Sequence, residues 1–399
     1  MKQSLVGAIL IISLFTVQLH AQDTLRNRKD GNYLFKVEVD LEANEVQNQN
    51  RTGTCWSFSA LSFMESELIR MGKGKHKLSE MYVVRKAYLD KAEKYIRMHG
   101  TTNFGQGGAF HDIPYVIDHY GIVPESVYQG LNYGEDKHNH SEMENVLKAM
   151  CDAIIKNSQG HLTTSWKAAI DGVLDAYLGE VPDTFTYQGK NYTPKSFANS
   201  LGLKMSDYVI LTSFSHHPFY SSFVFEVPDN WMMASAYNVP LDEFITNINH
   251  SLRTGYSVAW ASDVSEKGFS FRNGLAIIPE DPSNLTMKGA DNKHFNDAGA
   301  ERTGTQFDAP GKELTVTQEM RQEAFDNYKT TDDHGMHFTG IVHDQNGTQY
   351  YMVKNSWGTA NDCDGYMYAS VPYVRYKTMN VMVHKDALEK STCKKLGLK

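Results

Sequence analysis

The chain has 399 residues, of which 41% are hydrophobic, 22% charged and 12% aromatic, enough apolar material for one large domain or two smaller ones. With 30 glycines, 11 prolines and only 4 cysteines, the composition excludes collagen-like, low-complexity and disulfide-rich scaffolds. The 39 basic and 47 acidic side chains give a formal net charge of −8, which argues against a general nucleic-acid or anionic-membrane surface.

The first 21 residues are typical of a secretory signal peptide. Lys2 supplies the positive end, residues 5–19 form an apolar run, and a small-residue cleavage site ends at Ala21, before Gln22. The run is shorter than the roughly 20 residues that span a bilayer, and no second run follows. We therefore expect an exported protein, periplasmic or secreted, without an integral membrane segment.

Export makes the cysteines informative, because an oxidising compartment favours disulfides. Cys151 follows helical spacing with Leu147 and Ile154, which predicts a buried core thiol. Cys363 lies in a polar loop and Cys393 in a basic tail. Each of these two is either inert or paired with the other.

Cys55 differs because it stands where a polar, glycine-containing turn runs into an amphipathic helix. Leu61, Met64, Leu68 and Met71 follow at spacings of three, four and three, which places them on one face of that helix. Unpaired amides and the helix dipole favour a thiolate at a helix start, so we expect a pKa below the ordinary value of about 8.5. A cysteine that merely begins a core helix fits the same pattern.

A nucleophilic thiolate also needs a proton acceptor and a donor to the oxyanion. Among 16 histidines, His334 stands out because it enters an alternating strand, and Asn355 closes the next strand. The dipeptide Asn346-Gly347 between them predicts a tight hairpin. The two strand ends can lie side by side, so Asn355 could accept the second ring N–H of His334 and fix its tautomer.

Three motifs in this order resemble the papain-like cysteine peptidases: Q-x5-C-W-S-F-S-A from Gln49, D-H-G-M-x-F-T-G around His334, and K-N-S-W-G around Asn355. The sequence is most similar to the bleomycin hydrolase and aminopeptidase C branch. The stretch that begins at Gly107 resembles that branch's Gly-Gly-started helix. Cys55 and His334 lie 279 residues apart, against roughly 130–150 in papain-type chains. A helical insertion typical of the branch would account for the difference.

The resemblance implies Cys55 as the nucleophile, His334 as general base and then acid, and Asn355 as the residue that orients the imidazole. Gln49, with the Cys55 backbone N–H, would hold the developing oxyanion. The implied reaction transfers the acyl group of a peptide substrate to the thiol and then to water. No cofactor and no metal is expected, because zinc-peptidase and nucleotide-binding motifs are missing from the sequence and His216-His217 is an isolated pair.

The resemblance also implies three residues around the substrate. Trp357 would shield the hydrogen bond between His334 and Asn355 from water, although an ordinary core tryptophan fits the same position. Gly107 and Gly108 would let an extended substrate backbone approach and pair closely. A simple loop before a helix explains the two glycines equally well.

The implied fold is α+β, a papain-like two-lobe fold with a helical lobe, an antiparallel barrel-like β lobe and a helical insertion. The expected order is signal peptide 1–21, then one peptidase domain 22–399 made of a helical lobe 22–130, a helical insertion 131–240, a β-rich lobe 241–384 and a basic C-terminal arm 385–399. Periodicity predicts helices at 78–96, 145–155, 165–178 and 241–252, a helix capped by Thr317, strands near 337–344, 349–355, 366–370 and 378–384, and a long surface loop at 284–310.

The arm leaves the type of peptidase open. In the resembling branch, a C-terminal arm lies in the cleft, its carboxylate grips the substrate's amino group, and the chains form hexamers. Here residues 385–399 carry five lysines against two acidic residues, a net charge of +3. Two hypotheses remain for peptide substrates: an aminopeptidase that removes N-terminal residues, and a papain-like endopeptidase without that restriction. A nucleic-acid-associated protein is a third hypothesis, disfavoured by net charge and export.

Overall fold

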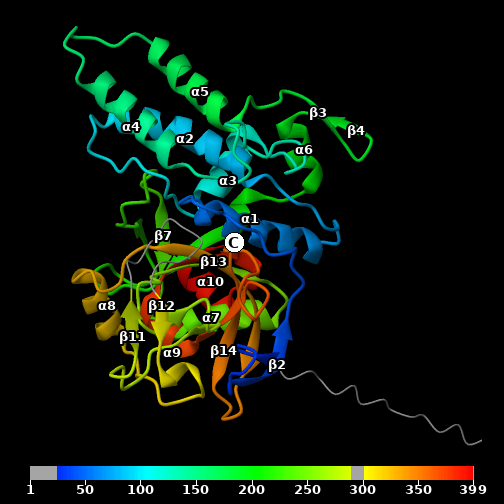
Figure 1. The fold of residues 1–399 in the computed structure, drawn as a ribbon, viewed down its shortest axis with the longest axis vertical. Coiled ribbons are helices and arrows are strands. Elements are labelled where there is room, and N and C mark those ends of the chain that lie inside the picture. The colour runs from blue at the N-terminus through cyan, green and yellow to red at the C-terminus, as the bar shows by residue number, and fades with distance from the viewer. Residues whose placement is uncertain (1–24, 289–300, 399) are drawn as a thin grey trace, which may run out of the picture.

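The computed structural model describes residues 25–288 and 301–398, so the predicted signal peptide and its cleavage site lie outside the described residues. Figure 1 shows a helical part above a large sheet, with helix α1 (Cys55–Arg70) between them. Within the described ranges, no helix combines the length and the apolar character needed to cross a bilayer. The two-lobe α+β architecture is the one that the sequence predicts.

Helix α2 (Glu80–Arg97) is the centre of the helical lobe, because it contacts the helices on both sides of it in the chain. Cys151 is fully buried in this core, as its helical spacing predicts. The remaining elements of the lobe are α3 (Asp112–Tyr120), α4 (Ser141–Ile155), α5 (Ser165–Leu178), the hairpin β3 (Phe185–Tyr187) and β4 (Lys190–Tyr192), and α6 (Pro194–Leu201).

The β lobe is one large sheet of mostly antiparallel strands, in the order β6-β7-β5-β16-β8-β13-β14-β15-β10-β9, with β2 also paired to β13 and β1 to β2. Only β5 with β7 and β10 with β15 are parallel pairs in it. Its strands are β1 (Leu25–Arg26), β2 (Leu34–Asp40), β5 (Tyr208–Thr212), β6 (Ser222–Val224), β7 (Ser235–Asn238), β8 (Val258–Ser262), β9 (Phe269–Ser270), β10 (Leu275–Ala276), β13 (His334–His343), β14 (Gln349–Lys354), β15 (Tyr366–Ser370) and β16 (Thr378–His384).

Helices and short turns surround this sheet. Thr317 caps α8 by accepting from the backbone N–H of Met320, as the sequence predicts. These surrounding elements are η1 (Met205–Asp207), α7 (Leu241–Arg253), the hairpin β11 (Thr286–Lys288) and β12 (Glu301–Thr303), η2 (Thr305–Phe307), α8 (Gln318–Asp326), α9 (Val371–Lys377), η3 (Lys385–Ala387) and α10 (Lys390–Leu396).

Two segments differ from the predictions. Residues 208–238, expected in a helical insertion, form β5, β6 and β7, and β5 pairs with β16 of the β lobe. Residues 284–310, expected as a surface loop, contain the hairpin of β11 and β12 and the fully buried Phe307. In both cases the strands are short, and β5 pairs with the distant β16, so local periodicity does not reveal them.

The C-terminal arm packs on helix α7. The Asn247 side chain donates to Thr392 Oγ1 at 3.0 Å, and Thr392 donates to Glu243 at 2.6 Å. Lys395 forms an ion pair of 2.8 Å with the same Glu243. Leu396 and the neighbouring apolar residues of the arm contact the core of the β lobe. The described part of the arm, residues 385–398, is therefore held on the β lobe.

The two lobes meet where α1 contacts β13. Gly335 lies at this contact, and a Cβ added there would lie 2.6 Å from Ser59 Oγ and 3.3 Å from the backbone oxygen of Cys55. Both distances are shorter than ordinary van der Waals contact. The close approach of α1 to β13 therefore requires glycine at this position.

We expect Gly335→Ala to reduce the free energy of unfolding by about 1–3 kcal/mol through overpacking, and to lower activity by moving β13 away from α1. Gly172→Ala is the matched control, because its added Cβ in α5 meets open space. In the control, the free energy of unfolding should rise by about 0.5–1 kcal/mol, because alanine is favoured over glycine inside a helix. Urea unfolding measures both changes, and a Gly335→Ala protein with unchanged stability and activity would contradict this role of the glycine.

Candidate active site

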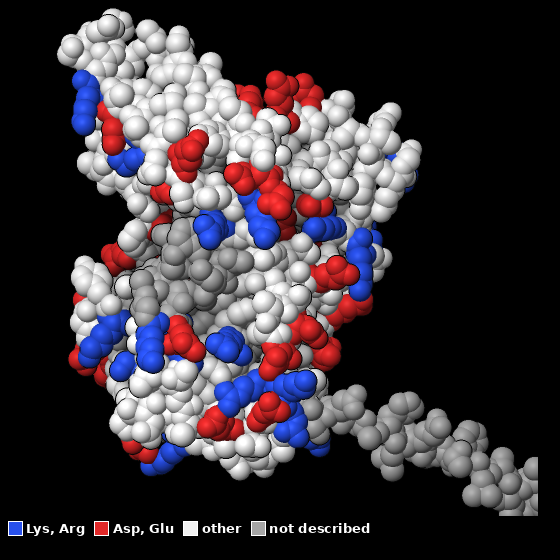
Figure 2. Space-filling view, viewed as in Figure 1, with Lys and Arg blue, Asp and Glu red and all other residues white. Residues whose placement is uncertain are grey.

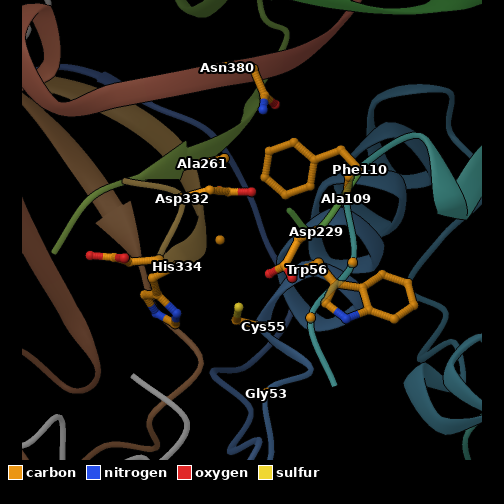
Figure 3. Close-up of a pocket in the computed structure, with 14 residues that line it drawn as sticks. Gly53, Cys55, Trp56, Ala109, Phe110, Asp229, Ala261, Asp332, His334 and Asn380 are labelled. Carbon is orange, nitrogen blue, oxygen red and sulfur yellow. The ribbon is translucent and has the colours of Figure 1, made fainter. Parts of the chain in front are cut away.

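A pocket opens at the junction of the two lobes (Figure 3). The start of α1, the loop before α3 and the start of β13 form its walls. Its lining residues are Gly53, Cys55, Trp56, Gly107, Gly108, Ala109, Phe110, Asp229, Ala261, Asp332, Asp333, His334, Gly335 and Asn380. The sulfur of Cys55 and the ring of His334 face each other across this pocket, although they come from opposite lobes.

The predicted hairpin brings Asn355 to His334. His334 is the first residue of β13, Asn355 directly follows β14, and the two strands pair as His337 with Lys354. His334 Nε2 lies 2.7 Å from Asn355 Oδ1, which also accepts the backbone N–H of Ser356. Because that oxygen only accepts, Nε2 carries the proton, which leaves Nδ1 as the free nitrogen of the neutral ring. Nδ1 is buried and has no hydrogen-bond partner among the described residues.

Trp357 covers this pair. Its ring stacks on His334 with the centroids 4.4 Å apart and the planes at 24°. The side chain is buried within the core of the β lobe. The indole therefore holds the imidazole in place and excludes water from one face of it, which is the position the resemblance implies for Trp357.

The pKa of Cys55 differs from the prediction. Burial raises the pKa of the thiol to about 12, and the charges of Asp332 and Asp229 raise it further, against the backbone amide of Gly335, which hydrogen-bonds to the sulfur. Burial also lowers the pKa of His334 to about 4, against the stabilising bond from Asn355. The expectation of a lowered thiol pKa is therefore wrong for this structure, because desolvation and two carboxylates outweigh the helix start.

Gln49 lies beside the pocket rather than in its lining. Its Nε2 donates to the Thr52 carbonyl at 2.7 Å, and its Oε1 accepts from Ser356 Oγ at 2.7 Å. The Gln49 backbone also donates to the Ser356 carbonyl, which ties the loop before α1 to the segment after Asn355. A carboxamide nitrogen carries two hydrogens, and the bond to Thr52 uses one of them.

Gly107 and Gly108 both line the pocket, and neither leaves room for a side chain. A Cβ on Gly108 would lie 2.6 Å from Asp112 Oδ2 and 2.8 Å from the Trp56 ring. A Cβ on Gly107 would overlap the carboxylate of Asp229. Glycine is thus required at both positions by the protein's own packing.

Sequence reasoning gave no role to four polar residues of the pocket: Asp229, Asp332, Asp333 and Asn380. Asp333 begins the motif around His334 and Asp332 directly precedes it, so the neighbourhood of these two residues is a signal in the sequence. Asp229 comes from the loop between β6 and β7, and Asn380 from β16. Nothing in the local sequence of these two residues indicates the cleft.

The cysteines other than Cys55 take no part in the pocket. All four cysteines lie in the described ranges and are free thiols, so the alternative of a Cys363–Cys393 disulfide is wrong for this structure. The Cys363 thiol donates to the Asn27 carbonyl at 2.9 Å, and the Cys393 thiol to the Lys385 carbonyl at 3.5 Å.

A group of possible metal ligands lies outside the pocket lining. The structure adds Glu226 to the pair His216 and His217, and the three ligand atoms lie within 4.8 Å of one another. His216 Nε2 and the Glu226 carboxylate are 2.9 Å apart. Imidazole and carboxylate ligands suit Zn²⁺, but this group does not contact the reacting thiol.

Figure 2 shows acidic and basic side chains interspersed over the visible face of the molecule, with no large area of a single sign. Nucleic-acid binding depends on clustered positive charge that neutralises phosphates. This face therefore offers no such surface.

A nucleophile, a neutral imidazole and an orienting asparagine at the junction of a helical and a β lobe define a papain-like cysteine peptidase. The chain matches the model of the Peptidase C1-like family over residues 15–278 and 311–398, and it belongs to that family.

Relatives place the chain in the aminopeptidase C branch. It is 23% identical to the aminopeptidase C of Streptococcus thermophilus, over 93% of this chain and 86% of that one. It is also 23% identical to the bleomycin hydrolase of Rattus norvegicus, over 88% of this chain and 83% of that one. Among solved structures, that of PepW from Lactobacillus rhamnosis HN001 has a TM-score of 0.69 at 19% identity and covers 91% of this chain and 84% of its own.

The pKa of His334 gives a pH prediction. Because burial disfavours the imidazolium, the ring stays neutral and able to accept the thiol proton down to about pH 4. We expect kcat/KM on a peptide substrate to fall with a midpoint near this pH as acid is added, while circular dichroism checks that the fold persists. A midpoint near 6.5, the ordinary value for histidine, would show that His334 is not desolvated as described.

Proposed function

We propose that this chain is a cysteine aminopeptidase, which removes single residues from the N-termini of peptides. The observation that carries the proposal is the position of Asp229 against Gly107, at the end of the pocket. An extended substrate would lie along Gly107 and Gly108 on its way to Cys55. The Asp229 loop occupies the space over Gly107, so the pocket has room on this side for the first residue of a peptide and not for a longer chain.

The loop that carries Asp229 is held firmly. Asn230 Nδ2 donates to the carbonyls of Phe225 and Ala234, each at 2.8 Å, and closes the loop on itself. Trp231 Nε1 donates to Asp112 Oδ2 at 2.8 Å, which anchors the loop to the start of α3. Both side chains are buried. The obstruction is therefore a built part of the fold, which supports the aminopeptidase over the endopeptidase.

The chemistry follows from the geometry of the pair. His334 Nδ1 takes the proton of the Cys55 thiol as the sulfur attacks the carbonyl carbon, and Asn355 holds the ring in the tautomer that allows this. The backbone N–H of Cys55 and the second amide hydrogen of Gln49 stabilise the oxyanion. His334 then gives its proton to the leaving amine, and it activates the water that hydrolyses the thioester.

The relatives named aminopeptidase C support this proposal, since the match extends over most of both chains. The basic arm, which favoured the endopeptidase in the sequence, lies on α7, and none of residues 385–398 lines the pocket. The proposal also places the protein outside the cytoplasm, which the predicted signal peptide supports. A homo-oligomer stays a prediction from the resemblance.

Hydrolysis of matched fluorogenic substrates tests the proposal. We expect an aminoacyl amide with a free α-amino group to be cleaved at least about tenfold faster in kcat/KM than its N-acetyl derivative, because the added group would collide with the Asp229 loop or remove a charge. Cys55→Ala should abolish both activities, while Cys151→Ala, which removes a buried thiol outside the pocket, should retain them. Equal cleavage of the free and blocked substrates would establish the endopeptidase.

Deletion of residues 397–399, beyond the end of α10, tests the arm separately. Because the described part of the arm is anchored on α7 through Thr392 and Lys395, we expect the truncated protein to fold and to keep its preference for a free amino group. The ratio of kcat/KM for free and N-acetyl substrates measures this preference. Its loss on truncation would show that the end of the arm, and not the Asp229 loop, restricts the enzyme to N-termini.

A further inference from the structure

Two histidines and a glutamate converge on one point outside the pocket lining. His216 and His217 lie in the loop between β5 and β6, and Glu226 follows shortly after β6. One oxygen of the Glu226 carboxylate is 2.9 Å from His216 Nε2, and the other is 3.6 Å from His217 Nε2. The ligand atoms of the three residues lie within 4.8 Å of one another. The pair that is isolated in the sequence thus acquires a third ligand in the fold.

The separations between these atoms are close to those around a metal ion. A tetrahedral Zn²⁺ with nitrogen and oxygen ligands at about 2.0–2.2 Å holds neighbouring ligand atoms about 3.3–3.6 Å apart. The two distances from the carboxylate to the imidazoles, 2.9 and 3.6 Å, span this range. Small rotations of the side chains therefore suffice to place the three ligand atoms around one ion.

The charges at this point also favour a cation. Among the ion pairs of the described residues, those of Glu226 are with the two imidazoles, and none is with a lysine or an arginine. An imidazole is positive only when it is protonated, and two imidazolium rings with centroids 4.6 Å apart would repel each other. A divalent cation satisfies the carboxylate and both ring nitrogens without that repulsion.

Aromatic packing holds both rings in place. His217 stacks on Phe223, with the centroids 4.2 Å apart and the planes at 20°. His216 stacks on Phe325 of α8, with the centroids 5.6 Å apart and the planes at 23°. The two imidazoles are thus oriented before an ion binds, which reduces the entropy that binding would otherwise cost.

Gln322 of α8 supplies the outer partner that metal-bound histidines usually have. Its Oε1 accepts the backbone N–H of Ser215 at 2.6 Å, and its Nε2 donates to Asp326 Oδ1 at 2.9 Å, which fixes the orientation of the amide. His216 Nδ1 lies 3.3 Å from that Oε1 and 3.1 Å from that Nε2. When Nδ1 carries the ring proton and donates it to Oε1, the lone pair of His216 Nε2 is free to bind a metal.

We propose that His216, His217 and Glu226 form a binding site for Zn²⁺, with water in the fourth coordination position. Imidazole and carboxylate ligands suit this ion, and three protein ligands with one open position are an established arrangement for it. The bound ion links the loop between β5 and β6 to the start of the loop that carries Asp229. This inference does not depend on the proposed aminopeptidase function.

Equilibrium dialysis of the full chain against Zn²⁺ tests the site. The variants that change a ligand or the outer partner are His216→Ala, His217→Ala, Glu226→Gln and Gln322→Ala. His161→Ala is the matched control, because His161 is an exposed histidine between α4 and α5 and is not part of the group. Cys55→Ala removes the catalytic thiol, which could bind Zn²⁺ itself as a thiolate.

We expect one equivalent of Zn²⁺ per chain in the wild type, in Cys55→Ala and in His161→Ala. Gln322→Ala should weaken the affinity by about 10- to 100-fold, the usual effect of losing an outer partner, and each ligand variant should weaken it further. Zn²⁺ should raise the Tm of the wild type and not that of the ligand variants, because an ion stabilises only the folded state that it binds. Without metal, all variants should unfold near the wild-type Tm.

Co²⁺, which takes the same ligands, reports on them directly. The Co²⁺-loaded protein should show visible d–d bands without the near-ultraviolet charge-transfer band of a cobalt–thiolate bond, and added Zn²⁺ should remove these bands. The same spectrum is expected for Cys55→Ala, since the thiol takes no part in the site.

Three results would overturn the site. If the wild type binds no Zn²⁺, the group is an ordinary ion pair between Glu226 and the two imidazoles. If folded ligand variants bind Zn²⁺ with wild-type affinity, the ion lies elsewhere. If Cys55→Ala abolishes binding and the wild-type Co²⁺ spectrum shows a thiolate band, the ion binds at the catalytic thiol. None of these results bears on the aminopeptidase function, which the free and N-acetyl substrates test separately.

Discussion

The contact between the start of α1 and the start of β13 is the constraint on which the site depends. Ser59 Oγ bonds the carbonyl of Cys55 at 2.6 Å, and Gly335 lets β13 approach closely enough for its amide to reach the Cys55 sulfur. His334 precedes this glycine, so the same contact that joins the lobes sets the imidazole opposite the thiol. The hairpin then carries Asn355 to the far side of the ring, and no other element is needed to complete the pair.

Burial gives this arrangement its particular electrostatics. The thiol and the imidazole are both favoured in their neutral forms, because desolvation penalises each charged form. Asp229 and Asp332 strengthen this preference for a neutral thiol.

The sequence predicts those features that depend on neighbours in the chain. Cys55 at a helix start, Thr317 as a cap, and the hairpin that joins His334 to Asn355 all follow from local pattern and motif. The position of Asp229 does not follow from local pattern, because it depends on a loop that Trp231 anchors to another lobe. The raised pKa of the Cys55 thiol does not follow from local pattern either, because tertiary packing sets how deeply the thiol is buried. The insertion ends earlier than the sequence predicts for the same reason, because β5 is recognisable as a strand only beside β16.

The mass of the acyl-enzyme tests most directly that Cys55 accepts one N-terminal residue at a time. An unblocked peptide of mixed sequence is mixed with the enzyme, the reaction is quenched in acid within its first turnover, and Cys55 is examined by mass spectrometry. A thioester at Cys55 that carries the peptide's first residue alone is the expected result. An adduct of several residues, or acylation at any residue other than Cys55, would contradict the aminopeptidase mechanism.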